Sequence, residues 1–330
     1  MAPVVPSHKF ASLRGGGGGQ AARTGLGRGL RHRGGLQKEL AVAVEANELV
    51  RLSRSIERLQ AFVRAHPRLL LITGAGCSTD SGIPDYRDGD GRWKRKQPIQ
   101  FQDFLRSESS RRRYWARSLV GWPAMAAAAP NRIHRTVAAM EQAGQAWWTV
   151  TQNVDGLHQR AGSRKVTDLH GRLDSVTCLS CGARKARCLF QTELLDLNPA
   201  WRDADVAATP VPIAPDGDAD LERADFDRFE IPCCERCGGV WKPDVVFFGE
   251  NVPKPRVADV FAKLHEVDAV LVLGSSLMVW SSFRFVRAAV EAGQPVAAVN
   301  LGRTRADAAL SLKVEAPAAE VLPCLVEQPA

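Results

Sequence analysis

The sequence predicts an α/β fold in which a doubly wound parallel sheet carries two inserted modules, one helical and one rich in cysteine. Continuous apolar runs of strand length occupy residues 69–73, 147–152, 268–274 and 295–300. Such runs are typical of parallel strands that are buried on both faces. Residues 39–66 and 283–292 show helical spacing, and they supply helices of the kind that cover such a sheet.

A glycine turn follows the first predicted strand. Residues 69–73 lead directly into Gly74-Ala-Gly76, and a turn of this kind can present backbone N–H groups to a phosphate. Polar residues also follow the other three strands, at Gln152-Asn-Val-Asp155, Gly274-Ser-Ser276 and Asn300-Leu-Gly302. Because the carboxyl ends of parallel strands share one edge of a sheet, we expect these residues to meet in one crevice suited to a nucleotide.

The dinucleotide fingerprint G-x-G-x-x-G is met only in part. Gly74 and Gly76 fit it, but position 79 is Thr and the next glycine is Gly82. No acidic residue ends a second strand about 20 residues further on, where a hydride-transferring dehydrogenase holds the ribose. The pattern therefore argues against an ordinary dehydrogenase.

The net charge of +8 is concentrated at the N-terminus. Residues 1–38 hold seven basic side chains and no acid, whereas the remainder holds 37 basic and 36 acidic side chains. A nearly neutral remainder gives little support to a nucleic-acid groove. We expect residues 1–38 to be a disordered basic extension, with an Arg-rich organelle transit peptide as the alternative. No apolar run approaches ~20 residues, so no membrane span is expected.

Residues 39–330 are expected to form one folded domain. Residues 91–145, rich in Arg, Trp and Ala and interrupted by prolines, predict the helical module. Residues 172–245 lose periodicity and carry the cysteines, and proline and aspartate cluster at 209–220, which predicts a surface loop. The core of the domain then takes about residues 45–90, 146–171 and 246–326.

Two C-x-x-C pairs predict a structural zinc site. The pairs are Cys178-x-x-Cys181 and Cys234-x-x-Cys237, each followed by a glycine. Two such turns can direct four thiolates at one ion and leave no coordination position for water. Cys188 and Cys233 are left over, because ligation through Cys233 would need the less usual spacing C-x₃-C. A redox dithiol and a set of unrelated buried thiols remain alternatives.

A set of further segments carries a family resemblance. In order along the chain, they are Gly74-Ala-Gly-x-Ser78, Gly82-Ile-Pro-Asp-Tyr-Arg87, Thr151-Gln-Asn-Val-Asp155, Leu169-His-Gly171, Pro243-Asp-Val-Val-Phe-Phe-Gly249, Gly274-Ser-Ser-Leu277 and Val299-Asn300. Together with the cysteine pairs, they resemble the sirtuins, a family of NAD-dependent protein-lysine deacylases. The resemblance covers about residues 45–326, and it implies a Rossmann-like core with an inserted zinc-binding module. Arg113-Tyr-Trp-Ala-Arg117 and Gly121-Trp-Pro123 look like the class II branch, which has a mitochondrial member and many bacterial ones.

The resemblance implies a role for each matching position. His170 would be the general base, with Asn153 and Asp155 at the nicotinamide pocket. The residues implied to bind NAD are Gly74, Ala75, Gly76, Ser78, Ile83, Pro84, Asp85, Tyr86, Arg87, Gln152, Asn153, Val154, Asp155, Gly274, Ser275, Ser276, Asn300, Leu301, Gly302 and Ala318. The residues implied to bind one Zn²⁺ are Cys178, Cys181, Cys234 and Cys237. Those implied to pair with an extended substrate peptide are Val246, Phe247, Phe248 and Gly249. His134, His158 and Cys77 are interpreted as structural.

The implied reaction consumes NAD. The amide oxygen of acyl-lysine attacks C1′ of the nicotinamide ribose and expels nicotinamide, while dipoles of Asn153 and Asp155 stabilise the oxocarbenium-like charge. His170 then accepts a proton from a ribose hydroxyl that attacks the imidate carbon, and water releases lysine and O-acyl-ADP-ribose. An imidazole suits this role because its ordinary pKa lies near neutral pH.

The acyl group is left open by the sequence. The Tyr-x-x-Arg pair of desuccinylating relatives is absent from residues 88–94, so a charged acyl group loses its expected carboxylate clamp. Protein ADP-ribosylation or lipoamide cleavage at the same NAD site is the alternative function, and a non-catalytic NAD-binding module is a third. The expected partners are proteins with acylated lysine, and neither nucleic acid nor membrane is expected. A monomer in the bacterial cytoplasm is expected, with the mitochondrial matrix as the second location.

Overall fold

The computed structural model describes residues 49–94, 97–201, 213–221 and 225–326. The chain divides into two compact units, Met1–Arg51 and Leu52–Ala330. In the first unit, the described residues 49–51 are helical, and the predicted extension of residues 1–38 lies outside the described residues. Within the described ranges, no helix combines the length and the apolar character that a membrane span requires.

The second unit is organised around a parallel sheet of six strands in the described residues, in the order β3-β2-β1-β7-β8-β9. The strands are β1 (Leu69–Thr73), β2 (Ala146–Thr151), β3 (Val166–Asp168), β7 (Ala269–Leu273), β8 (Val296–Val299) and β9 (Leu312–Val314). The doubly wound parallel sheet predicted from the sequence is therefore confirmed. This order places a topological switch point between β1 and β7, where open α/β sheets bind ligands. The short edge strands β3 and β9 were not predicted.

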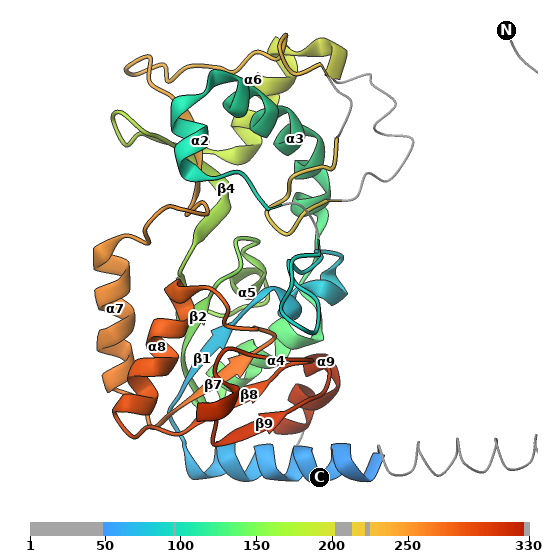
Figure 1. Ribbon diagram of the computed structural model, residues 1–330, viewed down its shortest axis with the longest axis vertical. Coiled ribbons are helices and arrows are strands. Elements are labelled where there is room, and N and C mark those ends of the chain that lie inside the picture. The colour runs from blue at the N-terminus through green and yellow to red at the C-terminus, as the bar shows by residue number, and fades with distance from the viewer. Residues whose placement is uncertain (1–48, 95–96, 202–212, 222–224, 327–330) are drawn as a thin grey trace, which may run out of the picture. The chain divides into compact units, whose positions relative to one another are not determined.

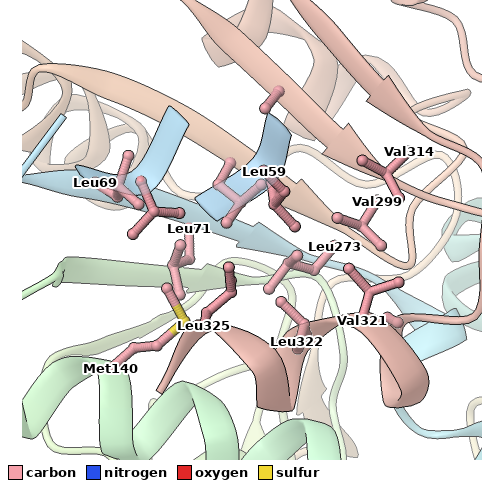
Figure 2. Close-up of a cluster of buried hydrophobic side chains, with 14 of the residues drawn as sticks. Leu59, Leu69, Leu71, Met140, Leu273, Val299, Val314, Val321, Leu322 and Leu325 are labelled. Carbon is pink, nitrogen blue, oxygen red and sulfur yellow. The ribbon is translucent and has the colours of Figure 1, made fainter. Parts of the chain in front are cut away.

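Alternate residues of the central strands bury opposite faces of the sheet. Leu69 and Leu71 of β1 belong to one hydrophobic cluster, whereas Leu70 and Ile72 belong to another. The first cluster, drawn in Figure 2, packs against residues 52–65, which are helical, and the C-terminal segment. The second packs against α7 (Lys254–His265) and α8 (Trp280–Glu291). Each such side chain contributes roughly 1.5–3 kcal/mol when fully buried, so both layers hold the strands in register.

Helices fill most of the predicted helical module. They are α2 (Phe101–Arg106), α3 (Glu108–Ala127) and α4 (Arg132–Gln142). The helix α4 begins at a capping box, in which the Asn131 side chain accepts from backbone N–H groups of the first turn and the His134 ring faces the Asn131 N–H. This cap fixes where the module returns to the sheet.

The cysteine-rich insert contains a small antiparallel sheet. Its strands are β4 (Gly171–Cys178), β5 (Arg184–Ala186) and β6 (Trp241–Val245), in the order β5-β4-β6. The helix α6 (Arg187–Leu197) packs on β4, and Figure 1 shows α2, α3, α6 and β4 gathered apart from β1, β7 and β8. Shorter helical turns are α5 (Leu157–Arg160), α9 (Ala318–Val321), Pro199–Trp201, Asp307–Ala309 and Leu322–Leu325.

The surface loop predicted for residues 209–220 is wrong for residues 217–219, within the described part 213–220. Gly217, Asp218 and Ala219 are buried, and Ala219 exchanges hydrogen bonds with Arg117 of α3. Proline, aspartate and glycine indicate a turn, but they do not tell whether the turn meets solvent or another element. Here the turn closes on itself, from the N–H of Gly217 to the carbonyl of Ala214 at 2.9 Å, and lies on α3.

Replacing Gly121 by alanine is expected to destabilise the protein, although alanine favours an isolated helix by about 1 kcal/mol. A Cβ on Gly121 would lie 1.9 Å from the carbonyl oxygen of Gly217. Urea unfolding should show a loss of about 1–3 kcal/mol, as for other overpacked positions. Ser109→Ala on the exposed side of the same helix is the control and should stay within about 0.5 kcal/mol. Unchanged stability of Gly121→Ala would contradict the described packing on α3.

Candidate functional site

Glycines let the loops after β1 and β7 touch at the switch point. The N–H of Gly76 donates to the carbonyl of Gly274 at 2.9 Å, and Gly274 has a φ of 55°. A Cβ on Gly74 would lie 2.7 Å from the Cβ of Ser275, and one on Gly274 would lie 2.7 Å from the Cys77 nitrogen. Side chains at these positions would separate the two loops, so glycine is needed for their contact as well as for any approach of a phosphate.

A buried polar network fixes the residues after β2. Asn153 donates from Nδ2 to the carbonyl of Gly74 and to Ser78 Oγ, both at 3.0 Å. Ser78 in turn donates to Asp155 Oδ2 at 2.7 Å, and the other oxygen of Asp155 accepts from the Leu157 N–H. The amide and the carboxylate are therefore held in place before any ligand arrives, which is what electrostatic catalysis requires of its dipoles.

His170 immediately precedes β4 and has hydrogen-bond partners at both ring nitrogens. Its Nδ1 faces the carbonyl oxygen of Gln152 at 2.9 Å, and its Nε2 faces Ser281 Oγ at 2.8 Å. Burial lowers the pKa of His170 from 6.5 to about 4, against the opposing effect of the Gln152 carbonyl. The ring is therefore neutral at pH 7 and can accept a proton.

The loop that carries Arg87 closes on itself. The Arg87 guanidinium lies 4.1 Å from the centre of the Trp93 ring, and it donates to the carbonyl of Gly91 at 2.7 Å. The rings of Tyr86, Trp93 and Phe248 pack edge-on against one another. Because guanidinium has five N–H donors, Arg87 keeps donors for an anion while it is held in this position.

The loops after β7 and β8 complete the arrangement. Gln152 Nε2 donates to Ser275 Oγ at 2.8 Å, and Asn300 Nδ2 donates to the carbonyl of Leu301 at 2.8 Å. Leu301 itself is 60% exposed. Gly302 packs against Gly89, because a Cβ there would lie 2.4 Å from the Gly89 carbonyl oxygen. This contact joins the β8 loop to the Arg87 loop.

A cavity of about 820 Å³ lies among these loops. Its size is in the range of ~300–1,000 Å³ that is usual for small-molecule sites. The residues predicted from the sequence that line it are Ala75, Gly76, Ser78, Ile83, Asp85, Tyr86, Arg87, Gln152, Asn153, Val154, Asp155, His170, Val246, Phe247, Phe248, Gly249, Gly274, Ser275, Ser276, Asn300 and Leu301. Gly74, Pro84, Gly302 and Ala318 are not among its lining residues. Ala318 is buried in the hydrophobic cluster that contains Leu69 and Leu71.

Several lining residues had no motif to indicate them. Pro215 and Asp216 reach the cavity from the buried turn on α3, and burial raises the pKa of Asp216. Trp93 supports Arg87, and Ser281 contacts the His170 ring. The positions of these residues depend on tertiary packing. Only Ser281 could have been suspected from the sequence, because it closely follows the Gly274-Ser-Ser276 strand end.

Four cysteines form a second candidate site. The Sγ atoms of Cys178 and Cys237 are 3.6 Å apart, those of Cys181 and Cys234 are 3.8 Å apart, and all four lie within 4.8 Å of one another. Tetrahedral zinc with Zn–S bonds of about 2.3 Å spaces its sulfurs by ~3.8 Å, so the donor set fits Zn²⁺. The glycines after the two pairs have φ of 69° and 72°, as the tight turns require.

The fold and these two sites define a class, a Rossmann-type nucleotide-binding protein with an inserted four-thiolate metal site. The Sir2 family model matches residues 74–281. An NAD-dependent protein deacetylase of Xanthomonas campestris pv. campestris (strain 8004) is 57% identical over 280 residues, which cover 85% of this chain and 94% of that protein. The human NAD-dependent protein lipoamidase sirtuin-4, mitochondrial, is 45% identical over 273 residues, 82% of this chain and 85% of that protein. The chain belongs to the Sir2 family.

Solved structures of the family share the fold. A Sir2 structure with a p53 peptide and NAD⁺ matches with a TM-score of 0.63 at 27% sequence identity, over 81% of this chain and 95% of that one. A structure of Sir2Tm bound to a propionylated peptide matches with a TM-score of 0.63 at 26% identity, with the same two coverages. The match with human sirtuin-4 supports the class II resemblance.

Replacing Cys234 by serine is expected to remove the metal and lower the unfolding temperature, because the free energy of zinc binding is also free energy of folding. Metal analysis of the wild type should give about one zinc per chain. Cys233→Ser is the matched control, because the neighbouring thiol is exposed and outside the four-sulfur group. Loss of zinc from Cys233→Ser with retention in Cys234→Ser would reverse the ligand assignment.

Two buried histidines behind the site are expected to make stability fall in acid. Burial lowers the pKa of His134 to about 4 and that of His158 to about 3, while the unfolded side chains keep about 6.5. Above pH 6.5 neither state binds these protons; between about pH 6.5 and 4 only the unfolded chain does, so stability is lost as pH falls. Urea unfolding from pH 7.5 to 5 should show a smaller slope in His158→Gln, by up to ~1.4 kcal/mol per pH unit. His265→Gln, at an exposed position, is the matched control for the loss of a histidine.

Proposed function

We propose that this protein is an NAD-dependent protein-lysine deacetylase that cleaves NAD into nicotinamide and O-acyl-ADP-ribose. One observation carries the proposal: His170, held by the Gln152 carbonyl at Nδ1, lines the same cavity as the glycine turn and the polar ends of β1, β2, β7 and β8. Such a cavity suits a dinucleotide, and a neutral imidazole in its wall suits base catalysis. The deacetylases named among the relatives support the same conclusion.

The residues present fit NAD as a co-substrate. Its pyrophosphate would lie against the backbone of the loop from Gly74 to Gly76 and against the Arg87 guanidinium, which is held over Trp93. The nicotinamide ribose would lie near Asn153, Asp155 and His170, and the adenosine half near Ser275 and Asn300. Gly302 and Ala318 would support that end from outside the cavity wall.

In the proposed reaction, the chain's own groups act in two stages. Asn153 and Asp155, fixed through Ser78, offer oriented dipoles to the positive charge that develops as nicotinamide leaves. His170 then receives a ribose proton at Nε2, while Nδ1–H stays bonded to the Gln152 carbonyl. The Cys₄ site would hold one structural Zn²⁺, because four thiolates leave no open position for chemistry.

The acylated protein would enter along Val246–Gly249, which follows β6 and lines the cavity. The N–H of Val246 already donates to the carbonyl of His170 at 2.7 Å, so a peptide paired with this segment would be held close to the base. Solved relatives with p53 and propionylated peptides support acyl-lysine as the substrate class. The human relative's name supports lipoyl-lysine as a second acyl group.

The remaining assignments form part of the proposal. The bacterial relatives support a cytoplasmic location, and we propose that the enzyme is a monomer. Residues 39–330 would form the catalytic domain, with residues 1–38 as a basic extension.

Replacing His170 by alanine is expected to lower peptide-dependent turnover by about 10²–10⁴-fold, the usual effect of removing a general base. The assay supplies NAD with acetyl-, butyryl- and lipoyl-lysine peptides and follows free lysine peptide and O-acyl-ADP-ribose by mass spectrometry. His265→Ala, an exposed histidine at the end of α7, is the matched control and should retain wild-type turnover.

Two results would contradict this proposal in different ways. Mass added to an acceptor protein, with no acylated ADP-ribose, would identify an ADP-ribosyltransferase. Full turnover by His170→Ala would remove the histidine from the mechanism.

A further inference from the structure

The partners of His170 define which ring nitrogen is free to act as a base. A backbone carbonyl can only accept a hydrogen bond, so the contact with Gln152 places the proton of the neutral ring on Nδ1. Nε2 then carries the lone pair, and the hydroxyl of Ser281 must donate to it. The nitrogen that would take a ribose proton is therefore occupied by a serine hydroxyl in the described arrangement.

Ser281 lies in a helical turn that is anchored beside His170. It is the second residue of α8 and lines the cavity, and among the described residues its side chain has no other hydrogen-bond partner. Its neighbour Ser282 is fully buried and donates to the side chain of Gln152 at 2.9 Å. The first turn of α8 is thus tied to the same residue whose carbonyl holds the other side of the ring.

We propose that Ser281 is a positioning residue for His170 that changes from hydrogen-bond donor to acceptor during the reaction. This inference rests on the proposed function. Before the ribose hydroxyl arrives, Ser281 donates to Nε2 and keeps that nitrogen directed into the cavity. The ribose hydroxyl then takes its place as donor. When the ribose oxygen bonds to the imidate carbon, its proton moves to Nε2, and Nε2–H donates to Ser281 Oγ, which keeps its own proton.

The surroundings of His170 make such an acceptor necessary. Arg256 of α7 is the charged group that acts on the ring, and it opposes a positive charge there. The N-terminal end of α8 opposes it as well, because helix N-termini carry partial positive charge. The Gln152 carbonyl stabilises the imidazolium at Nδ1. Ser281 would supply the matching acceptor at Nε2, and hydrogen bonds to a charged donor are about twice as strong as neutral ones.

The test compares two partial reactions of Ser281→Ala. Deacylation of acetyl-lysine peptide should fall by about 10- to 100-fold, the value of one hydrogen bond to a charged group. Exchange of labelled nicotinamide into NAD should stay within about twofold, because nicotinamide leaves before the base acts. Ser281→Thr keeps the hydroxyl and is the matched control; it should recover most of the deacylation rate. Equal losses in both reactions would mean that Ser281 only maintains the structure of α8, and this result would overturn the inference. Deacylation at the wild-type rate by Ser281→Ala would also overturn it.

A second measurement does not depend on activity. In protein labelled with ¹⁵N-histidine and free of substrate, the His170 signals should show protonated Nδ1 and hydrogen-bonded, unprotonated Nε2. Ser281→Ala should change the Nε2 signal, and His158, which faces Thr73 instead, is the internal control. An Nε2–H tautomer, or an unchanged Nε2 signal in Ser281→Ala, would overturn the inference. The predicted spectra in a protein without NAD-dependent turnover would refute the proposed function while leaving the Ser281 contact in place.

Discussion

The contact between the β1 loop and the β7 loop is the constraint on which the site depends. Gly76 and Gly274 meet through a backbone hydrogen bond, and neither Gly74 nor Gly274 has room for a Cβ. The same β1 loop contacts the residues after β2, because β1 pairs with β2 and the Gly74 carbonyl accepts from Asn153. A larger residue would separate the loops and release the polar network beyond them. The glycines are therefore needed first for the contact between the two loops, and they affect ligand binding through that contact.

Within this frame, the side chains that would act on the substrate are held mainly by other parts of the protein. Ser78 connects Asn153 to Asp155, Trp93 supports Arg87, and the first turn of α8 faces His170. Such preorganisation lowers the cost of ordering groups in the transition state. The cavity walls come from segments far apart in sequence, because each acting side chain comes from one segment and is held in place by a residue from a different segment.

Strands and motifs could be predicted from the sequence because their causes are local. Leu69–Thr73 is apolar at every position but Thr73, and a run of this length followed by a glycine turn is typical of a buried strand. The spacing of the cysteine pairs predicts a four-thiolate site, and the four sulfur atoms do lie within 4.8 Å of one another. The turn at residues 213–219 could not be placed, because its burial depends on Gly121, nearly a hundred residues away. The predicted place of Ala318 near the adenine rested on a loose motif, and its side chain lies in the core.

The low pKa of His170 raises the question of how such a ring can serve as a base. Burial favours the neutral ring, which keeps Nε2 available at neutral pH, but it also makes proton acceptance unfavourable. On the proposed function, NAD brings an anionic pyrophosphate into the same cavity, and a nearby negative charge stabilises the imidazolium. Proton transfer from the ribose would then become easier only when the co-substrate is bound. Without NAD, His170 would be a neutral and weakly basic ring, and with NAD bound it would be a stronger base. Burial of the ring and the charge of NAD would together restrict proton transfer to the enzyme–NAD complex.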